Sequence, residues 1–365
     1  MRALVISHLL MFTLMFVFMG SDPYILRHAH VYGSAAIGIA SGLASLASFS
    51  SKIATAVKGL RSEVGAAISS SLILLASPLP LLGYYGFVTY MILTNMAFAI
   101  MVVSTLVVVA EAVDPSKLGF HYALRGVLMS IGGIAGPFVG AYLYSAMGLI
   151  GIALFQASSS LVMLSMALGL RGFGIKASSG LGFSKGWTLA YLTSLFLASS
   201  FMIISTYLPP YQASLGISLG ATSSYFSSRA FGSLLGRFPG GIMFDKGLAL
   251  FFLPSLIMLI ASLLAPQALT LSYSALVGFL VGFSWGIASP MLLSLAALES
   301  EKGKSMSLFV TGWDVASMTI VPLAGSLGSY SKSLQFSVLT SLLALALSAA
   351  LSLHARRYLA LRRSR

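Results

Sequence analysis

The sequence has no cysteine and little charge. Only 8% of its 365 residues are charged, and 8 acidic residues stand against 21 lysines and arginines. Without cysteine, the chain cannot form disulfides, thiolate nucleophiles or cysteine-ligated metal centres. A typical soluble domain carries about 25% charged residues. The charge deficit therefore excludes an ordinary soluble protein.

Apolar residues dominate the chain instead, at 58% of the sequence. Apolar runs of about 18 residues or more recur along it, which is the length needed to cross roughly 30 Å of hydrocarbon. We predict an all-α membrane protein with twelve transmembrane helices. The predicted spans are residues 4–27, 32–52, 63–82, 86–110, 120–146, 148–170, 187–209, 219–241, 248–265, 271–297, 305–327 and 333–355.

The sequence repeats itself at about half its length. Four pairs of similar residues are 185 positions apart, and a second set, Pro23-Tyr24 with Pro210-Tyr211, is 187 apart. Duplicated hydrophobic chains are typical of secondary transporters. We therefore predict two pseudo-symmetric six-helix bundles, 1–170 and 187–365, joined by a cytoplasmic linker at 171–186. The 185-residue pairs are Asp114 with Glu299, Lys117 with Lys302, Pro137 with Pro322, and Gly140 with Gly325.

The basic residues gather on one side of the predicted membrane. Nearly all fall on the side of the two termini, whereas Arg27 and Lys332 lie on the other side and Arg229 lies within a span. Basic loops stay in the cytoplasm, so we predict a multi-pass protein of the cell membrane with both termini cytoplasmic. The net charge of +13 then reflects topology and not nucleic-acid binding.

The predicted fifth span carries a glycine stripe with a proline inside it. Gly132, Gly136 and Gly140 recur every four residues, so they share one helix face and allow another helix to approach closely. Pro137 removes a backbone hydrogen bond and favours a bend. This Gly-Pro run resembles the fifth-helix motif of antiporters in the major facilitator superfamily. We expect a gating helix at the joint between the halves, with tight packing inside any helical bundle as the alternative.

A second motif closes the predicted eighth span. Gly241, Asp245 and Lys246 resemble the superfamily's signature between the second and third helices of each half. The carboxylate can accept from the N-terminus of a neighbouring helix, and the base can reach facing carbonyls or acids, forming a conformational clasp. The equivalent first-half loop, residues 50–63, lacks that carboxylate. We also assign Arg237 and Glu111 to the gating group; Glu111 either pairs with a motif base or only sets the topology.

The resemblance implies a central cavity lined by helices one, four, seven and ten. It implies a secondary active transporter that exports a small molecule by proton antiport. The alternatives are a facilitator or anion transporter using Arg229, or a receptor or scaffold with the same fold. Eight scattered acids do not form a catalytic site, so we expect no enzyme. We also expect no metal or cofactor beyond the proton gradient, and a monomer whose partners are substrate, protons and lipid.

Ionisable residues within spans are costly and therefore mark functional sites. Asp314 is the first candidate for proton coupling, because a carboxyl group in apolar surroundings holds its proton until water returns. Its alternative is a permanent salt bridge to Arg229 or Arg237. Asp22 is the second candidate, with local pairing to Arg27 near water as its alternative. Met129 mirrors Asp314 in the repeat, so we expect the second half to carry the ion chemistry.

Arg229 is also a candidate ligand for an anionic substrate. The uncharged candidates for the cavity include an amide, which is costly to leave unpaired in lipid, and aromatic side chains, which more often serve packing. These uncharged candidates are Asn95, Tyr207, Tyr211 and Trp285.

Overall fold

The computed structural model describes residues 2–58, 60–112, 118–170, 184–246, 248, 250–299 and 309–363. All regular structure among these described residues is helical. The linker predicted at 171–186 lies mostly outside them, as do residues 305–308 of the predicted eleventh span.

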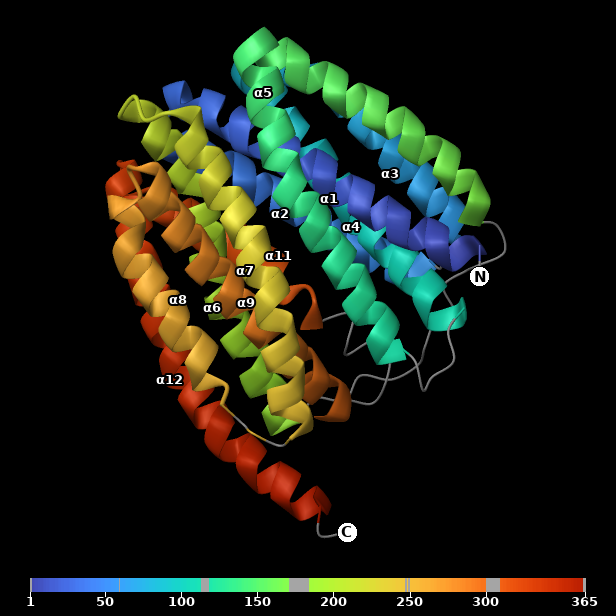
Figure 1. The fold of residues 1–365 in the computed structure, drawn as a ribbon, viewed down its shortest axis with the longest axis vertical. Coiled ribbons are helices and arrows are strands. Elements are labelled where there is room, and N and C mark those ends of the chain that lie inside the picture. The colour runs from blue at the N-terminus through green and yellow to red at the C-terminus, as the bar shows by residue number, and fades with distance from the viewer. Residues whose placement is uncertain are drawn as a thin grey trace.

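The N-terminal helices are α1 to α5, joined by short 3-10 turns. They are α1 (Arg2–His28), η1 (Ala29–Tyr32), α2 (Ser34–Lys58), α3 (Ser62–Ala76), η2 (Leu79–Leu82), α4 (Gly83–Ala112), α5 (Leu118–Ala167) and η4 (Leu168–Leu170). The long α5 is interrupted at Gly148, whose φ of 59° and ψ of −144° are not helical. Glycine tolerates this positive φ because it has no Cβ. The chain reverses there, at the top of Figure 1, and the predicted fifth and sixth spans lie on either side of the reversal.

The C-terminal helices are α6 to α12. They are α6 (Lys185–Ser214), α7 (Leu219–Asp245), α8 (Phe252–Leu264), η5 (Ala265–Gln267), α9 (Leu271–Glu299), α11 (Gly312–Gly325) and α12 (Tyr330–Arg363).

Seven helical stretches of the described residues are long and apolar enough to cross a membrane. Helices α3, α8 and α11, with 15, 13 and 14 residues, are each shorter than the usual span of about 20 residues. The chain is thus multi-pass, and the prediction of twelve crossings stays a prediction. The seven stretches are 2–32, 34–55, 62–105, 124–170, 185–214, 271–296 and 330–356.

Two long interfaces join the N-terminal to the C-terminal helices. Helix α2 packs against α11, and α5 packs against α7. Figure 1 shows the two groups of helices converging at the end away from the chain termini and spreading apart toward N and C. The chain therefore has two helix groups that meet along two interfaces.

The glycine stripe of α5 does not lie at the joint between those groups. A Cβ at Gly132, Gly136 or Gly140 would collide with backbone carbonyls of α1. The stripe therefore packs tightly within the N-terminal helices, which is the alternative given above, while α5 itself lies at the joint through its contacts with α7. Gly133, one residue after Gly132 and about 100° around the helix, faces α7 at Ala230.

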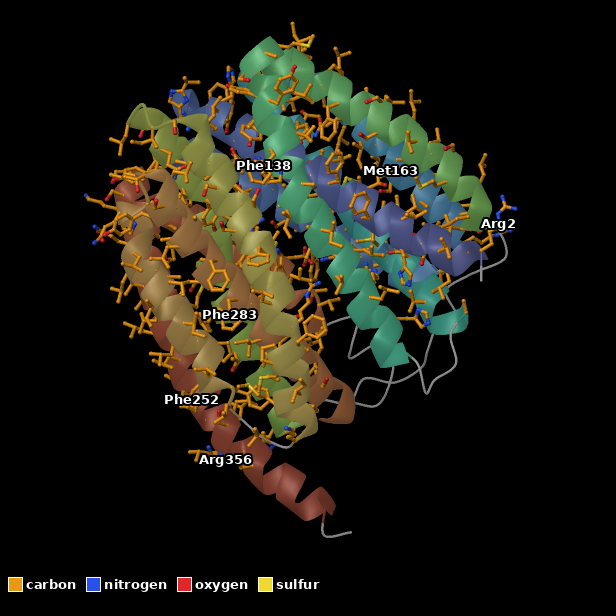
Figure 2. The ribbon with its side chains drawn as sticks, viewed as in Figure 1. Arg2, Phe138, Met163, Phe252, Phe283 and Arg356 are labelled. Carbon is orange, nitrogen blue, oxygen red and sulfur yellow. The ribbon has the colours of Figure 1, made fainter. Side chains whose placement is uncertain are left out.

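The outer surface of the bundle is apolar. Phe138 of α5 is 59% exposed and Phe252 of α8 is 36% exposed. Both side chains are labelled in Figure 2, as are Arg2 and Arg356 near the two ends of the chain. A surface of exposed apolar side chains is expected where lipid, and not water, surrounds the helices.

Candidate functional site

Asp314 lies in the first turn of α11, buried against α2. Its Oδ2 is 2.7 Å from the Nζ of Lys52, and its Oδ1 accepts a 2.7 Å hydrogen bond from Ser48 Oγ. Ser48 and Lys52 are four residues apart, so both face α11 from one side of α2. The partner of Asp314 is therefore Lys52, and neither Arg229 nor Arg237, as the sequence had led us to expect.

The α2–α11 interface continues from this ion pair to the opposite end of both helices. Ser34 Oγ donates a 3.1 Å hydrogen bond to the carbonyl oxygen of Gly325. Between these points Gly38 has no room for a side chain, because a Cβ there would meet the hydroxyl of Tyr207. Tyr207 is fully buried and donates 2.7 Å to the carbonyl of Val321. This cavity candidate therefore ties α6 to α11 inside a packed interface.

Asp22 on α1 is held by neutral side chains. Its Oδ1 accepts a 2.6 Å hydrogen bond from the hydroxyl of Tyr90 on α4, and that hydroxyl accepts a 2.6 Å hydrogen bond from Gln156 Nε2 on α5. Among the described residues it forms no salt bridge. Arg27 does not pair with it, because its guanidinium donates to Thr222 and to the carbonyl of Ile217. The local pairing expected for Asp22 is therefore wrong.

Arg229 on α7 lies in an aromatic cage. Its guanidinium carbon is 4.5 Å from the ring centre of Phe226 and 4.8 Å from that of Phe201. Nη1 donates 2.6 Å to Ser205 Oγ, and Nη2 approaches Met19 Sδ of α1 at 2.9 Å. Cation–π contacts stabilise a desolvated guanidinium without consuming a carboxylate. Asp22 acts on this cation electrostatically, yet the two groups do not form an ion pair.

An aromatic cluster connects the Arg229 cage to the start of α11. Phe201 is 4.8 Å from Trp313 between ring centres, and Trp285 is 4.6 Å from Trp313. Trp313 precedes Asp314 in sequence. The predicted cavity residue Trp285 thus lies in a continuous group of rings from Arg229 to the ion pair.

The other two cavity candidates lie apart from this cluster. The Asn95 amide donates 2.9 Å to the carbonyl of Met91 in its own helix, so it is already paired. Tyr211 lines a pocket of about 310 Å³ with Ser34 and Tyr330, at the end of the α2–α11 interface away from the termini.

The motif residues are only partly described. Arg237 lies against Gly126 of α5, and its buried Nη1 has no hydrogen-bond partner in the described part of the chain. A Cβ at Gly241 would meet no other atom within 4 Å, and Lys246 is exposed. The side chains of Asp245 and Glu111 lie outside the described residues, so the clasp and the role of Glu111 stay predictions.

Four polar residues of this region escaped the sequence analysis: Ser48, Lys52, Tyr90 and Gln156. Lys52 was counted among the basic residues at the end of its span, whereas α2 continues to Lys58 and carries Lys52 within the helix. Gln156 lies in an apolar run of the sequence. Because burying an unpaired amide costs free energy, its presence there could have indicated a buried hydrogen-bond partner.

The sequence profile of the Major Facilitator Superfamily matches residues 4–322. The structure resembles a bacterial homolog of the human lysosomal transporter Spinster in an inward-facing and occupied conformation, with a TM-score of 0.66, 13% identity and coverage of 97% and 96% of the two chains. It resembles a mutant peptide transporter POT in complex with alafosfalin, with a TM-score of 0.74, 15% identity and coverage of 98% and 94%.

The E. coli fucose:proton symporter gives a TM-score of 0.60 at 14% identity, with coverage of 96% and 99%. No curated protein matches the sequence. At identities this low, the structural matches show a shared fold and nothing finer.

Proposed function

This chain belongs to the Major Facilitator Superfamily, and from that premise we propose that it exports a small molecule across the cell membrane in exchange for protons. It is a secondary transporter of small molecules, not an enzyme, and it works by alternating access. The observation that carries the proton coupling is the contrast between Asp22, whose carboxylate accepts from the neutral Tyr90 and has no ion pair among the described residues, and Asp314, which is ion-paired.

The proposed topology has twelve crossings with both termini in the cytoplasm. The break at Gly148 supports two crossings within α5, and the asymmetry of basic residues supports the orientation. The proposed units are residues 1–170 and 187–365, because α1 to α5 pack mainly among themselves and meet the rest along α2–α11 and α5–α7. The fifth-helix motif supports the antiport direction, and no second chain is required.

We assign proton binding to Asp22. A carboxyl group without a cationic partner, in a region of low dielectric, favours its neutral form and releases its proton when water or a cation approaches. Its protonated form would keep the hydrogen bond with Tyr90, whereas its charged form would attract Arg229 across the boundary between α1 and α7. Proton release would thus pull the two helix groups together at this point.

We assign gating to Lys52 and Asp314. The ion pair crosses the α2–α11 interface on the side of the chain termini, so the two helices cannot separate there without breaking it. Exposing the pair to water compensates for the lost contact, because hydration stabilises both free charges. The pair therefore acts as a latch that favours one state without locking it.

The test uses the absence of cysteine. One variant carries two introduced cysteines, at Val5 and Lys246, which are exposed near the termini-side ends of α1 and α7. Spin labels then react at these two positions alone, because the chain has no native cysteine. We expect the distance between the two spin labels, measured by double electron–electron resonance in nanodiscs, to change between alkaline and acidic buffer. A second pair at Leu82 and Leu215, on the other side, should shift in the opposite sense.

Replacing Asp22 by Asn should abolish both pH-dependent shifts, because the amide cannot change its charge. The matched control is Asp314→Asn, which should change the starting distances but keep a pH response. A full pH response in the Asp22→Asn variant would contradict the assignment of proton binding to Asp22.

A second function is supported by the cage of Arg229. A buried guanidinium that no carboxylate neutralises among the described residues can bind an anionic substrate directly. A facilitator or anion transporter of this kind would move substrate independently of a pH gradient. Proteoliposome uptake of a panel of organic anions separates the two: transport insensitive to pH, and lost in Arg229→Ala, would favour this second function.

A further inference from the structure

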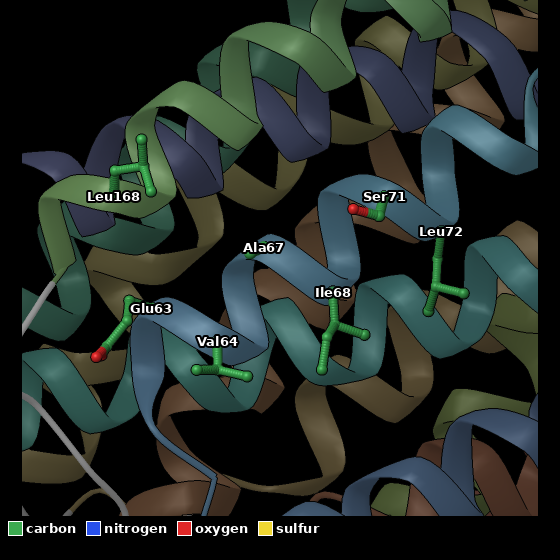
Figure 3. A pocket seen from close by; sticks show the side chains of 7 residues that line it. All are labelled: Glu63, Val64, Ala67, Ile68, Ser71, Leu72 and Leu168. Carbon is green, nitrogen blue, oxygen red and sulfur yellow. The ribbon is translucent and has the colours of Figure 1, made fainter.

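Two pockets of the described residues differ in the chemistry of their walls. The larger, of about 470 Å³, lies on α3, where Val64, Ile68 and Leu72 line it (Figure 3). Its mainly apolar walls continue the apolar outer surface of the bundle. The smaller pocket, of about 310 Å³, is lined by glycine, serine and tyrosine, and no charged or aliphatic side chain of the described residues lines it. The walls of the smaller pocket are therefore neutral and rich in hydroxyl groups.

The small pocket lies where the two helix groups meet, at the end of the α2–α11 interface away from the chain termini. Ser34 of α2 lines one side, and Tyr211 of α6 and Tyr330 of α12 line the other. Ser34 Oγ donates to the carbonyl of Gly325 at 3.1 Å, and the hydroxyl of Tyr330 donates to the carbonyl of His30 at 2.8 Å, so residues of the pocket also join the two groups. A molecule in the pocket therefore contacts both groups at once.

The polar groups of the pocket supply both acceptors and donors. Ser34 and Tyr330 use their protons on the carbonyls just described, and Ser214 Oγ donates 2.8 Å to the carbonyl of Tyr211 in its own helix. Each of these three hydroxyl groups can still offer a ligand an oxygen that accepts. Ser329 Oγ instead accepts from a backbone N–H of α12, so its own proton is available to donate. Backbone N–H groups at the starts of α2 and α12 add donors, because the first N–H groups of a helix have no partner within it.

A neutral ligand that carries several hydroxyl groups matches this combination. Each of its hydroxyl groups can donate to an oxygen of the pocket and accept from an N–H or O–H group. A carboxylate only accepts and an ammonium only donates, so either leaves one kind of polar group in the pocket unsatisfied. The rings of Tyr211 and Tyr330 add apolar area for the C–H groups of such a ligand. A volume of about 310 Å³ is at the low end of the range for small-molecule sites, which suits a single sugar ring.

We propose that this pocket binds a neutral sugar or a similar polyol from the side of the membrane away from the chain termini, and that the bound molecule holds the two helix groups together at that end. A ligand that binds one conformational state better than another shifts the population toward that state. The bound sugar therefore slows alternating access without being transported itself. The site is separate from Asp22 and Arg229, and its binding does not depend on the proposed exchange for protons.

Protection of a cysteine placed in the pocket tests the ligand class. Ser331→Cys, in nanodiscs free of glycoside detergent, reacts with a thiol-selective methanethiosulfonate reagent at slightly acidic pH, with D-glucose, D-glucuronate or D-glucosamine present. The chain has no other cysteine. We expect glucose to slow the reaction about twofold at half-saturation, because only the empty pocket reacts, and its two charged analogues to protect less. Tyr273→Cys, at an exposed residue that does not line the pocket, should react at the same rate throughout. Absence of protection by glucose, or equal protection by all three sugars, overturns the proposal.

The location of the site is tested by filling the pocket. Saturation-transfer difference NMR with glucose should give a signal for wild type and for Leu215→Trp, at an exposed residue that does not line the pocket. Ser214→Trp, which fills the pocket, should lose that signal. If Ser214→Trp fails to fold, Ser329→Trp fills the pocket from the other side. A signal that persists in the filled variant, or that is absent from wild type, excludes the site.

Spin labels test whether the bound sugar joins the two helix groups. The labels are placed on cysteines at Tyr85 of α4 and Tyr273 of α9, which are exposed at the end away from the chain termini. At one fixed pH, glucose should shift the distances between the labels toward shorter values, in Asp22→Asn as in wild type. Binding without this shift overturns the proposed bridging. A shift with glucose in a protein that does not respond to pH would support this site while the proposed proton exchange fails.

Discussion

Asp22 and Asp314 are carboxylates within helices of the same membrane protein, and their surroundings differ in kind. Asp314 is 3% exposed and is paired with Lys52 at 2.7 Å across the α2–α11 interface. Asp22 accepts one hydrogen bond from the phenol of Tyr90, and Arg229 acts on it electrostatically without forming an ion pair. A permanent cationic partner holds a carboxylate in its charged form, whereas a buried carboxyl group with a neutral partner favours its protonated form and ionises when water or a cation approaches. This difference is why we assign gating to Asp314 and proton binding to Asp22.

The largest effect should come from removing the partner of Asp314. Lys52→Ala leaves a buried carboxylate without its cation, which typically costs about 3–5 kcal/mol of unfolding free energy. Denaturation in mixed detergent micelles, followed by tryptophan fluorescence, measures that change. The matched control is Lys332→Ala, which removes an exposed lysine and should be close to neutral.

The double variant Lys52→Ala with Asp314→Ala sharpens this result. It should recover much of the lost stability, because no buried charge is left unpaired. Strictly additive effects of the two substitutions would show that the pair is not coupled in the folded protein.

An intermediate effect is expected at Tyr90, which links Asp22 to Gln156. Tyr90→Phe removes the donor to the carboxylate and the acceptor for the amide together. Leaving a polar group unsatisfied costs about 1–3 kcal/mol, so we expect a loss in that range from the same denaturation assay. Tyr84→Phe, at a tyrosine that contacts Tyr32 by its ring, is the control. An unaffected unfolding midpoint in Tyr90→Phe would mean that the neutral partners do not hold Asp22.

The smallest effect on stability should come from Asp22→Asn. The amide oxygen can still accept from Tyr90, so we expect the unfolding free energy to change by less than about 1 kcal/mol. The same substitution should nevertheless remove the pH dependence of the conformational equilibrium. Loss of stability comparable to that of Lys52→Ala would place Asp22 in a structural role and end the comparison between the two acids.

The fold was accessible from the sequence because its determinants are local. Apolar runs predict helices, and the Gly-Pro motif and Gly241-Asp245-Lys246 indicated the superfamily whose profile matches residues 4–322. Individual partners were not accessible. The partners expected for Asp314, Arg229 and Arg237, are on α7. The depth of a residue along its helix can be counted from the sequence, but the direction in which each helix turns its faces toward its neighbours cannot. For the same reason the sequence could not decide which neighbouring helix the glycine stripe of α5 faces.

The sequence by itself determined that the chain is helical, lies in a membrane and carries few charges within it, because hydrophobicity and charge act residue by residue. Only the tertiary structure decided which of those charges are neutralised. Lys52 and Asp314 are 262 positions apart, and Arg229 meets Met19 across 210 positions. Such contacts depend on how α2 is turned toward α11 and α7 toward α1. That rotation is set by the packing of whole helices, including the glycines that let them approach, and no single segment encodes it.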